Sequence, residues 1–136
     1  MDCLFCGIAC GDKDAKIFFD TDSSLAFLDV FPRVAGHTLV IPKKHAETVF
    51  DLSDEEIGIL FRDVREVTKK LNSTLSPDGF TIGINHGKAG GQAVEHLHIH
   101  IMPRFHDDGG GSLHSVVNDG SRRSIDDVFS LLVAKK

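Results

Sequence analysis

The stretch Glu95-His96-Leu97-His98-Ile99-His100-Ile101-Met102-Pro103-Arg104 alternates three histidines with aliphatic residues. Successive side chains of a β-strand point to opposite faces, so this period of two puts the imidazoles on one face. The aliphatic side chains then face the core. A helix would scatter the same residues around its circumference. We therefore predict a strand over residues 95–102 that carries a row of histidines.

The chemistry of this histidine row has two interpretations from the residues alone. Neutral imidazoles at i and i+2 can converge on one metal ion. Alternatively, one histidine is a nucleophile and the others place or polarise its target. A surface strand that happens to hold histidines is a third explanation, which the regular alternation disfavours.

A glycine-rich segment, Asn85-His86-Gly87-Lys88-Ala89-Gly90-Gly91-Gln92-Ala93-Val94, leads directly into the histidines. Glycines let the backbone turn tightly and approach a ligand, with N–H groups that can meet anionic oxygens. Asn85 and Gln92 add neutral donors and acceptors at either end. A glycine loop alone indicates only a turn. Beside three aligned histidines, it predicts a phosphate-binding loop next to a nucleophile.

These two segments together resemble the signature of the histidine-triad (HIT) family of nucleotide hydrolases and transferases. Two further segments carry the resemblance, Phe27-Leu28-Asp29-Val30 and Gly36-His37-Thr38-Leu39-Val40-Ile41-Pro42-Lys43-Lys44-His45. Members of this family attack the α-phosphorus of a nucleotide with the middle histidine and form a nucleotidyl-imidazole intermediate. The resemblance therefore implies that His98 is the nucleophile, with a backbone carbonyl fixing its tautomer.

The same resemblance implies roles for other residues. His100 would be the second catalytic residue, bonded to a phosphate oxygen as negative charge builds. Asp29 would accept hydrogen bonds from the ribose hydroxyls, although by itself it reads as a turn cap. The phosphate side of the site would be formed by Asn85, Gly91, Gln92, Ala93 and His100. The base pocket would be lined by Leu4, Phe5, Ile8, Phe27 and Val30, for which ordinary core packing is the alternative.

One position departs from the family pattern. Many HIT enzymes carry serine or threonine where this chain has Ala93, so only a backbone N–H remains to meet the phosphate or leaving group. This weakens the case for an amine leaving group that needs a hydroxyl partner. The Met102-Pro103-Arg104 ending resembles general HIT hydrolases and dinucleoside-polyphosphate hydrolases, and this resemblance implies that Arg104 could meet a distal phosphate.

Cys3-Leu4-Phe5-Cys6 has the spacing of half a zinc site. A redox pair is the rival interpretation, but thioredoxin-like motifs follow a strand, and nothing precedes this one. Two incidental buried cysteines are a further alternative. Resemblance to the zinc-bearing HIT branch implies one structural zinc on Cys3, Cys6, His45 and His96. No carboxylate cluster suggests Mg²⁺.

The remaining pattern predicts an α+β fold. Strands are expected over 16–20, 24–29, 37–42 and 80–85 in addition to 95–102. Ser53 and Glu56 form a capping box that begins a long helix with an apolar stripe, which extends towards Leu75. Ser124 begins a short helix. We expect a single HIT-like domain over 1–136, with a motif-bearing core over 3–105 and a C-terminal loop and short helix over 106–136. Its mainly antiparallel sheet of about five strands is packed by one long and one short helix.

Composition sets outer limits on function. The chain has 136 residues, which fits one domain, and its net charge of −5 offers no basic surface for nucleic acid. No apolar run reaches the length of a membrane span, and the polar N-terminus lacks a signal peptide, so we expect a cytoplasmic protein. Three cysteines argue against a disulfide framework. The resemblance also implies a homodimer, paired across the long helix and the glycine-loop strand.

The expected function is hydrolysis at the α-phosphate of purine nucleotide conjugates, either phosphoramidates or dinucleoside polyphosphates, through a nucleotidyl-histidine intermediate. The alternative is a regulatory or scaffold protein that binds purine nucleotides such as AMP with little turnover. A cupin-like metal enzyme is disfavoured because cupin ligands lie on distant strands and include a carboxylate.

Overall fold

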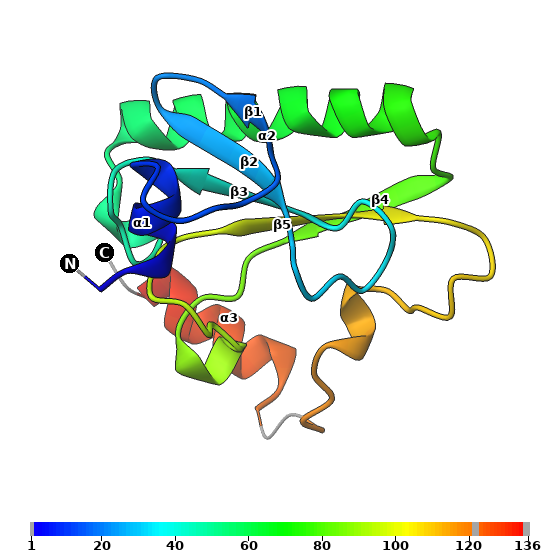
Figure 1. The fold of residues 1–136 in the computed structure, drawn as a ribbon. Coiled ribbons are helices and arrows are strands. Elements are labelled where there is room, and N and C mark those ends of the chain that lie inside the picture. Colours follow the sequence, from blue (N-terminus) through cyan, green and yellow to red (C-terminus); the bar gives the residue numbers. More distant parts are fainter. Residues whose placement is uncertain (1, 121–122, 135–136) are drawn as a thin grey trace.

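The computed structural model describes residues 2–120 and 123–134. Its centre is an antiparallel sheet of five strands in the order β1-β2-β3-β5-β4, which confirms the predicted α+β class (Figure 1). Its strands are β1 (Ile17–Asp20), β2 (Ser24–Leu28), β3 (Thr38–Pro42), β4 (Gly79–Gly83) and β5 (Ile99–Arg104). Because β5 lies between β3 and β4, the strand of the histidine row is internal to the sheet.

The long helix α2 (Asp54–Leu75) covers one face of the sheet (Figure 1). It begins with the predicted capping box of Ser53 and Glu56, in which each side chain bonds the other residue's backbone N–H. Its buried side chains form one core cluster with apolar residues of the sheet: Leu60, Val64, Val67 and Leu71 with Ala26, Val40, Leu97, Ile99 and Ile101. This cluster fixes which face of β5 is left for the histidines.

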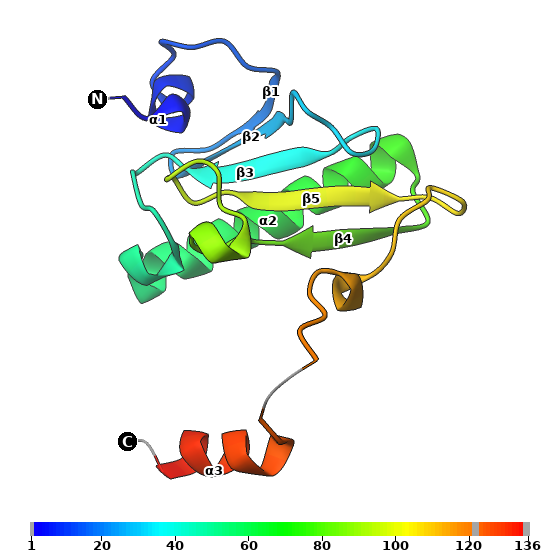
Figure 2. The same cartoon turned by 90° about the horizontal axis from the view of Figure 1, so that it is seen from below.

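The opposite face carries a short helix, α1 (Leu4–Ala9), which the sequence did not predict. Phe5 and Ile8 of α1 pack on Leu25, Phe27, Leu39 and Ile41 as a second core cluster. Figure 2 looks onto this face and shows α1 at the β1–β2 side, and none of the helices that the structure describes lies directly over β5 and β4. Six residues are too few for a periodic apolar stripe, so the pattern that reveals α2 is absent in α1.

The ends of several strands differ from the predicted ones. β5 begins at Ile99 rather than at residue 95, so His96 and His98 lie in the irregular segment that leads into the strand. In this segment the Leu97 N–H donates to Ala46 O at 2.7 Å. β2, β3 and β4 are likewise shorter than predicted and leave out Asp29, His37 and Asn85. Asp29, His37, Asn85, His96 and His98 thus lie just beyond strand ends, although the Asp29 N–H still donates to His37 O at 2.9 Å.

Helix α3 (Ile125–Ala134) is present where a short helix was predicted, but the predicted packing of that helix on the sheet is wrong. Figure 2 shows it standing away from the sheet, and none of its described residues is buried. Phe129 and Leu132 are 62% and 69% exposed. An apolar stripe indicates a helix with one side suited to burial, but it does not show against which surface that side packs.

A tight turn at Val34–His37 connects β2 to β3. His37 N–H donates to Val34 O at 3.1 Å, and Gly36 has φ +89°, which a type II turn requires at its third position. A Cβ atom at Gly36 would lie 2.5 Å from Leu75 Cδ1. The positive φ makes glycine the favoured residue at this position, and the end of the Leu75 side chain would have to move to admit a Cβ atom.

We therefore expect Gly36→Ala to lower the free energy of unfolding by about 1–3 kcal/mol, the cost of holding a residue with a Cβ atom in a strained backbone conformation. Urea unfolding followed by circular dichroism measures the change. The matched control is Gly58→Ala in the exposed side of α2, where a Cβ meets nothing within 4 Å. That change should leave stability equal or raise it by up to about 1 kcal/mol. Wild-type stability in the Gly36 variant would contradict the turn assignment.

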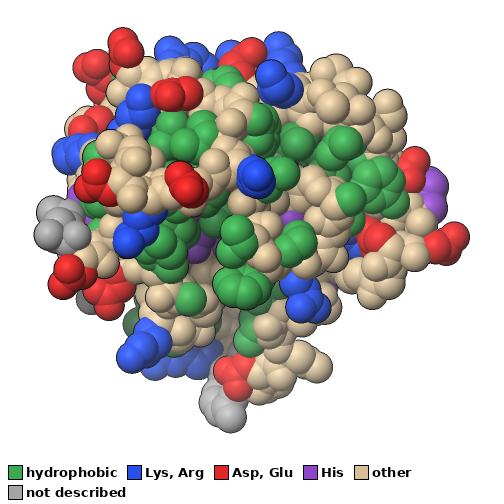
Figure 3. All heavy atoms as spheres, in the orientation of Figure 1, with side chains coloured by type: hydrophobic (Ala, Val, Ile, Leu, Met, Phe, Trp, Pro, Cys, Tyr) green, Lys and Arg blue, Asp and Glu red, His purple; other side chains and the backbone are tan. Residues whose placement is uncertain are grey.

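Charged side chains of both signs are interspersed over the face shown in Figure 3, with hydrophobic side chains between them. No described helix combines the length and the apolar character needed to cross a bilayer.

Candidate functional site

The histidines lie on the face of the sheet that α2 leaves free, next to α1. Phe5 of α1 packs edge-on against His98, with ring centroids 5.1 Å apart, and against His96 at 5.9 Å. His96 and His98 are buried, and His100 is partly buried. Two groups of side chains form along this row, one that includes His96 and one that includes His100.

His98 has a defined tautomer. Its Nδ1 lies 2.7 Å from the carbonyl oxygen of His96. A carbonyl oxygen can only accept a hydrogen bond, so Nδ1 carries the proton of the neutral ring and Nε2 keeps its lone pair. The predicted backbone carbonyl is therefore present, and the ring nitrogen that it leaves unprotonated is the one suited to nucleophilic attack.

His100 pairs with His37, a residue to which the sequence assigned no role. His37 Nε2 lies 2.9 Å from His100 Nδ1, and Asp29 Oδ2 lies 3.5 Å from His37 Nε2. The contact arises because Leu39 of β3 pairs with His100 of β5, and His37 precedes Leu39 by two residues. Period-two parity places His37 and Leu39 on one face, but only strand pairing brings that face to His100.

Burial keeps both of these histidines neutral. It lowers the pKa of His100 to about 4, with further lowering from the neighbouring His98 and His37 rings, while Asp29 acts in the opposite direction. Burial also lowers the pKa of His37; Asp29 opposes this shift and Arg33 adds to it. Near neutral pH, the pair therefore acts through hydrogen bonds rather than through positive charge.

The carboxylate of Asp29 takes part in two interactions. Its Oδ1 accepts the Phe31 N–H at 2.9 Å, which is the turn-cap role that the residue type suggests. Its Oδ2 is the oxygen nearest to His37. The carboxylate therefore caps the turn after β2 and also adjoins the histidine pair.

The four predicted metal ligands come together around His96. The Sγ atoms of Cys3 and Cys6 and a ring nitrogen of His45 and His96 all lie within 4.8 Å of one another. Cys3 Sγ is 3.3 Å and Cys6 Sγ 3.6 Å from His96 Nδ1, and Cys6 Sγ is 3.3 Å from His45 Nδ1. Tetrahedral zinc bonds place sulfur and nitrogen ligands roughly 3.5 Å apart. The group therefore fits one zinc-sized ion.

The tautomer of His96 also suits a metal ligand. Its Nε2 lies 2.8 Å from Pro42 O and must donate to it, so Nδ1 presents a lone pair towards the two thiols. Metal-bound histidines commonly donate their other N–H to a carbonyl in this way, which orients the ring.

The glycine-rich loop is held by its own backbone. The N–H groups of Gly91 and Gln92 donate at 3.0 Å to Lys88 O and Gly87 O. The structure thus differs from the expectation that these two amides face a phosphate, because both are already bonded inside the loop. Gly91 has φ +98°, and a Cβ there would lie 3.5 Å from the Asn85 side chain, so the two ends of the loop are in contact.

The Gln92 side chain also stabilises this loop. Its Oε1 accepts the Gly87 N–H at 2.8 Å, and its Nε2 donates to Glu47 O at 2.7 Å and Val94 O at 3.0 Å. These bonds use its amide within the protein and tie the loop to the segment after β3. Gln92 therefore shapes the approach to the histidines, and the adjoining Ala93 contributes no polar side chain.

The five predicted base-pocket residues separate into two groups. Phe5, Ile8 and Phe27 are buried in the cluster between α1 and the sheet. Leu4 and Val30 lie at the surface, 45% and 76% exposed. Core packing thus accounts for the first three, although Phe5 also borders His98.

Arg104 is occupied by contacts within the chain. Its Nε and Nη2 pair with the two oxygens of Asp108 at 2.7 and 2.9 Å, and its Nη1 donates to Thr81 Oγ1 and Gly111 O. The pairing holds the pKa of Asp108 well below its usual range. Arg104 therefore anchors the glycine loop after β5 in this structure, in place of the contact with a distal phosphate that the sequence suggested.

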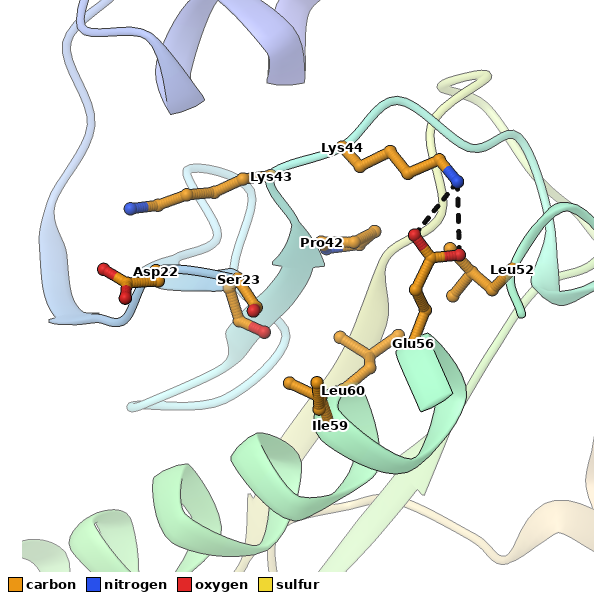
Figure 4. A pocket seen from close by; sticks show the side chains of 10 residues that line it. Asp22, Ser23, Pro42, Lys43, Lys44, Leu52, Glu56, Ile59 and Leu60 are labelled. Atoms are coloured by element: carbon orange, nitrogen blue, oxygen red, sulfur yellow. Dashed lines mark hydrogen bonds and ion pairs between the residues drawn. The ribbon is translucent and has the colours of Figure 1, made fainter. Parts of the chain in front are cut away.

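A separate pocket of about 180 Å³ lies on the α2 side of the sheet, between the start of β2, the end of β3 and the start of α2 (Figure 4). None of its lining residues is a histidine or a cysteine. Its two lysines are paired with carboxylates, Lys43 with Asp20 at 2.6 Å and Lys44 with Glu56 at 3.0 Å. The pocket shares only Pro42 with the surroundings of the histidines, through the Pro42 carbonyl that accepts the bond from His96 Nε2.

The chain is similar to known proteins over most of its length. The sequence model of the family described as HIT domain matches residues 11–107. The chain is 39% identical to adenosine 5′-monophosphoramidase of Schizosaccharomyces pombe, over 76% of this chain and 75% of that protein. It is also 39% identical to bis(5′-adenosyl)-triphosphatase of Dictyostelium discoideum, over 68% of this chain and 62% of that protein.

Solved structures have the same fold. A member of the HIT family from Bacillus subtilis superposes with a TM-score of 0.86 at 32% identity and covers 98% of this chain and 94% of its own. A Zn-bound histidine triad family protein from Mycobacterium smegmatis superposes with a TM-score of 0.75 at 36% identity, over 80% of this chain and 79% of its own.

Proposed function

Because the chain belongs to the HIT domain family, we propose that it hydrolyses purine nucleotide conjugates at the α-phosphate, with His98 as the nucleophile. The observation that carries the proposal is the 2.7 Å hydrogen bond from His98 Nδ1 to His96 O, which leaves Nε2 as a lone-pair nitrogen. The names of the two nucleotide-cleaving relatives support the same reaction class.

The reaction proceeds in two displacements. His98 Nε2 attacks the α-phosphorus in line and forms a P–N bond, while the bond to the leaving group breaks and that group departs with the electron pair and gains a proton. The ring now carries a positive charge, which the His96 carbonyl stabilises through Nδ1–H. Water then attacks the phosphorus, the P–N bond breaks, the water proton is lost, and the nucleoside monophosphate leaves.

The other site residues bind and orient the substrate in this proposal. Asp29 accepts the ribose hydroxyls, since a carboxylate has several acceptor positions and only some are used by its turn. The purine lies against the apolar surface bordered by Leu4, Phe5, Ile8, Phe27 and Val30. The phosphate side is shaped by Asn85, Gly91 and Gln92, with the Ala93 N–H and His100 as donors.

The leaving group is the least specified part of the substrate. One relative is named for a phosphoramidate and the other for a dinucleoside triphosphate. Ala93 supplies no hydroxyl to either, so we propose that both classes are cleaved and that recognition rests on the nucleotide half. The competing function is a nucleotide-binding protein with little turnover, which retains the same pocket.

We further propose that Cys3, Cys6, His45 and His96 hold one zinc ion. The donor set and spacing of these residues support it, and so does the Zn-bound structural neighbour. All four tetrahedral positions are filled by protein atoms, so the ion is structural and leaves no position open for substrate. The homodimer and the cytoplasmic location stay predictions from the sequence.

Hydrolysis of adenosine phosphoramidate, diadenosine triphosphate and their 2′-deoxy analogues tests the proposed function. We expect the 2′-deoxy change to lower kcat/KM by about ten- to hundredfold, because a lost charge-assisted hydrogen bond costs roughly 1.5–3 kcal/mol. Asp29→Asn should lower the rate on the ribose substrates by a similar factor and abolish discrimination. Guanosine substrates should stay within a few-fold of adenosine ones.

Asp14→Asn is the matched control, because this exposed carboxylate lies outside the site. No turnover of any substrate, together with AMP binding, would replace the hydrolase with the binding protein. Equal rates on ribose and 2′-deoxy substrates would leave Asp29 with its turn-cap role alone.

A further inference from the structure

A hydrogen-bond chain of defined direction leads from the backbone into the site. The Arg33 N–H donates to His37 Nδ1 at 3.1 Å. A ring nitrogen that accepts this bond has no proton of its own, so the neutral His37 ring must carry its proton on Nε2. One backbone amide thereby fixes the tautomer of a side chain that is 4% exposed.

The tautomer of His37 determines the direction of its hydrogen bond with His100. His37 Nε2 lies 2.9 Å from His100 Nδ1, and because Nε2 holds the proton, His100 Nδ1 is the acceptor. The neutral His100 ring must then carry its own proton on Nε2. That atom is buried and has no hydrogen-bond partner among the described residues. The hydrogen-bond chain therefore ends in an N–H group without an acceptor in the described part of the protein, and a buried donor of this kind calls for one.

His98 and His100 thus have opposite tautomers. The His96 carbonyl puts the His98 proton on Nδ1, whereas the bond from His37 puts the His100 proton on Nε2. The two rings are close, with centroids 5.2 Å apart. One ring presents a lone pair and its neighbour presents an N–H, which are the two functions that attack on a phosphate ester and binding of its oxygen require.

We propose that His37 is a positioning residue that, together with the Arg33 amide, holds His100 as the Nε2–H tautomer and so makes it a neutral hydrogen-bond donor to the substrate phosphate. His100 is then neither a base nor a second nucleophile. The assignment of the acceptor as phosphate rests on the proposed function, whereas the tautomers follow from the geometry of the free protein.

A metal ion is the rival occupant of this cluster, because Asp29, His37 and His100 offer ligand atoms within 4.8 Å of one another. A metal would need lone pairs on both facing nitrogens. The Arg33 N–H occupies His37 Nδ1 and forces a proton onto the facing Nε2. Asp29 Oδ2, at 3.5 Å, favours that proton as well. The hydrogen bond is therefore the better account of the 2.9 Å separation.

Long-range ¹H–¹⁵N correlation on uniformly ¹⁵N-labelled protein reports which nitrogen of each imidazole is protonated. With the free protein at pH 7, we expect proton on Nε2 of His37 and His100 and on Nδ1 of His98. A His100 ring protonated on Nδ1, or on both nitrogens, would overturn the proposal. This measurement uses no substrate, so it can fail while the hydrolase activity stands, and it can succeed in a protein that hydrolyses nothing.

Two substitutions separate positioning from packing. His37→Leu removes the donor, so we expect mixed His100 tautomers and a loss in kcat of about ten- to hundredfold, below the hundred- to thousandfold that deletion of an oxyanion-type donor causes. His37→Gln keeps an amide N–H that can donate to His100 Nδ1, so it should restore the Nε2–H tautomer and most of kcat. A folded Leu variant with wild-type tautomer and kcat would overturn the proposal. If the Leu variant does not fold, the Gln variant provides the test. A His100 proton on Nδ1 in that variant, without loss of kcat, would overturn the proposal.

Discussion

His98→Ala is expected to reduce hydrolysis of adenosine phosphoramidate and diadenosine triphosphate by at least about 10⁴-fold, the scale on which removal of a covalent nucleophile acts. The variant loses the Nε2 lone pair on which the P–N bond forms, and no neighbouring group replaces it, since His100 presents an N–H there. AMP binding, measured by calorimetric titration, should stay within a few-fold of wild type. Steady-state rates and acid-quenched single turnovers, which trap nucleotidylated protein, measure the chemical effect.

The control for this prediction is His106→Ala. His106 follows β5 by two residues and its side chain is 87% exposed, so the change removes an imidazole without touching the site. It should leave rate, trapped intermediate and AMP binding unchanged. A His98 variant with wild-type turnover, or trapped nucleotide attached elsewhere on the chain, would remove His98 from the role of nucleophile.

Local periodicity predicts a helix or strand when the element is long and one of its sides is buried. Helix α2 satisfies this condition, because its stripe and capping box are both readable and both are present. Helix α1 does not, because six residues carry too little pattern. The apolar stripe of α3 predicts the helix but not its exposed position. Whether such a stripe is buried depends on a partner surface that the local sequence does not contain.

The site shows the same division between local and distant information. The alternation at residues 96–100 indicates a chemical role for His98, and its tautomer depends on a carbonyl only two residues away. The bond between His37 and His100 joins residues 63 positions apart and exists only because β3 pairs with β5 in one register. No local pattern contains that register. The sequence likewise suggested that Arg104 binds a phosphate, and only the folded loop shows that Asp108 forms an ion pair with it.

The candidate zinc ligands were predicted partly from a local pattern and partly from the family resemblance. The spacing of Cys3 and Cys6 indicates two ligands, and resemblance to a family supplied the other two, which the fold brings within reach. Cys3 also begins α1, where its Sγ accepts the Cys6 N–H, and His96 lies in the irregular approach to β5. A bound ion would therefore join α1 to the segment that follows β3 and to the segment that leads into β5, both of which lie outside the strands.

Zinc removal is accordingly expected to destabilise the protein strongly. Structural zinc contributes apparent binding energies on the order of 10 kcal/mol, and only part of this is lost here because Phe5 and Ile8 also hold α1. A loss of about 4 kcal/mol would lower Tm by roughly 10 °C or more. Cys3→Ser and Cys6→Ser should show this drop and lose the metal.

The measurements are metal content of protein purified without chelator, and calorimetric melting before and after chelation and zinc addition. Cys10→Ser is the matched control, because Cys10 is exposed and lies outside the cluster; it should keep one zinc per chain and the wild-type Tm. The rate constant of chelated protein, assayed well below its Tm, should fall far less than in the His98 variant, since the ion has no open position for substrate. Metal-free protein whose Tm does not respond to zinc would refute the site, and the two thiols would then be ordinary packing and capping residues of α1.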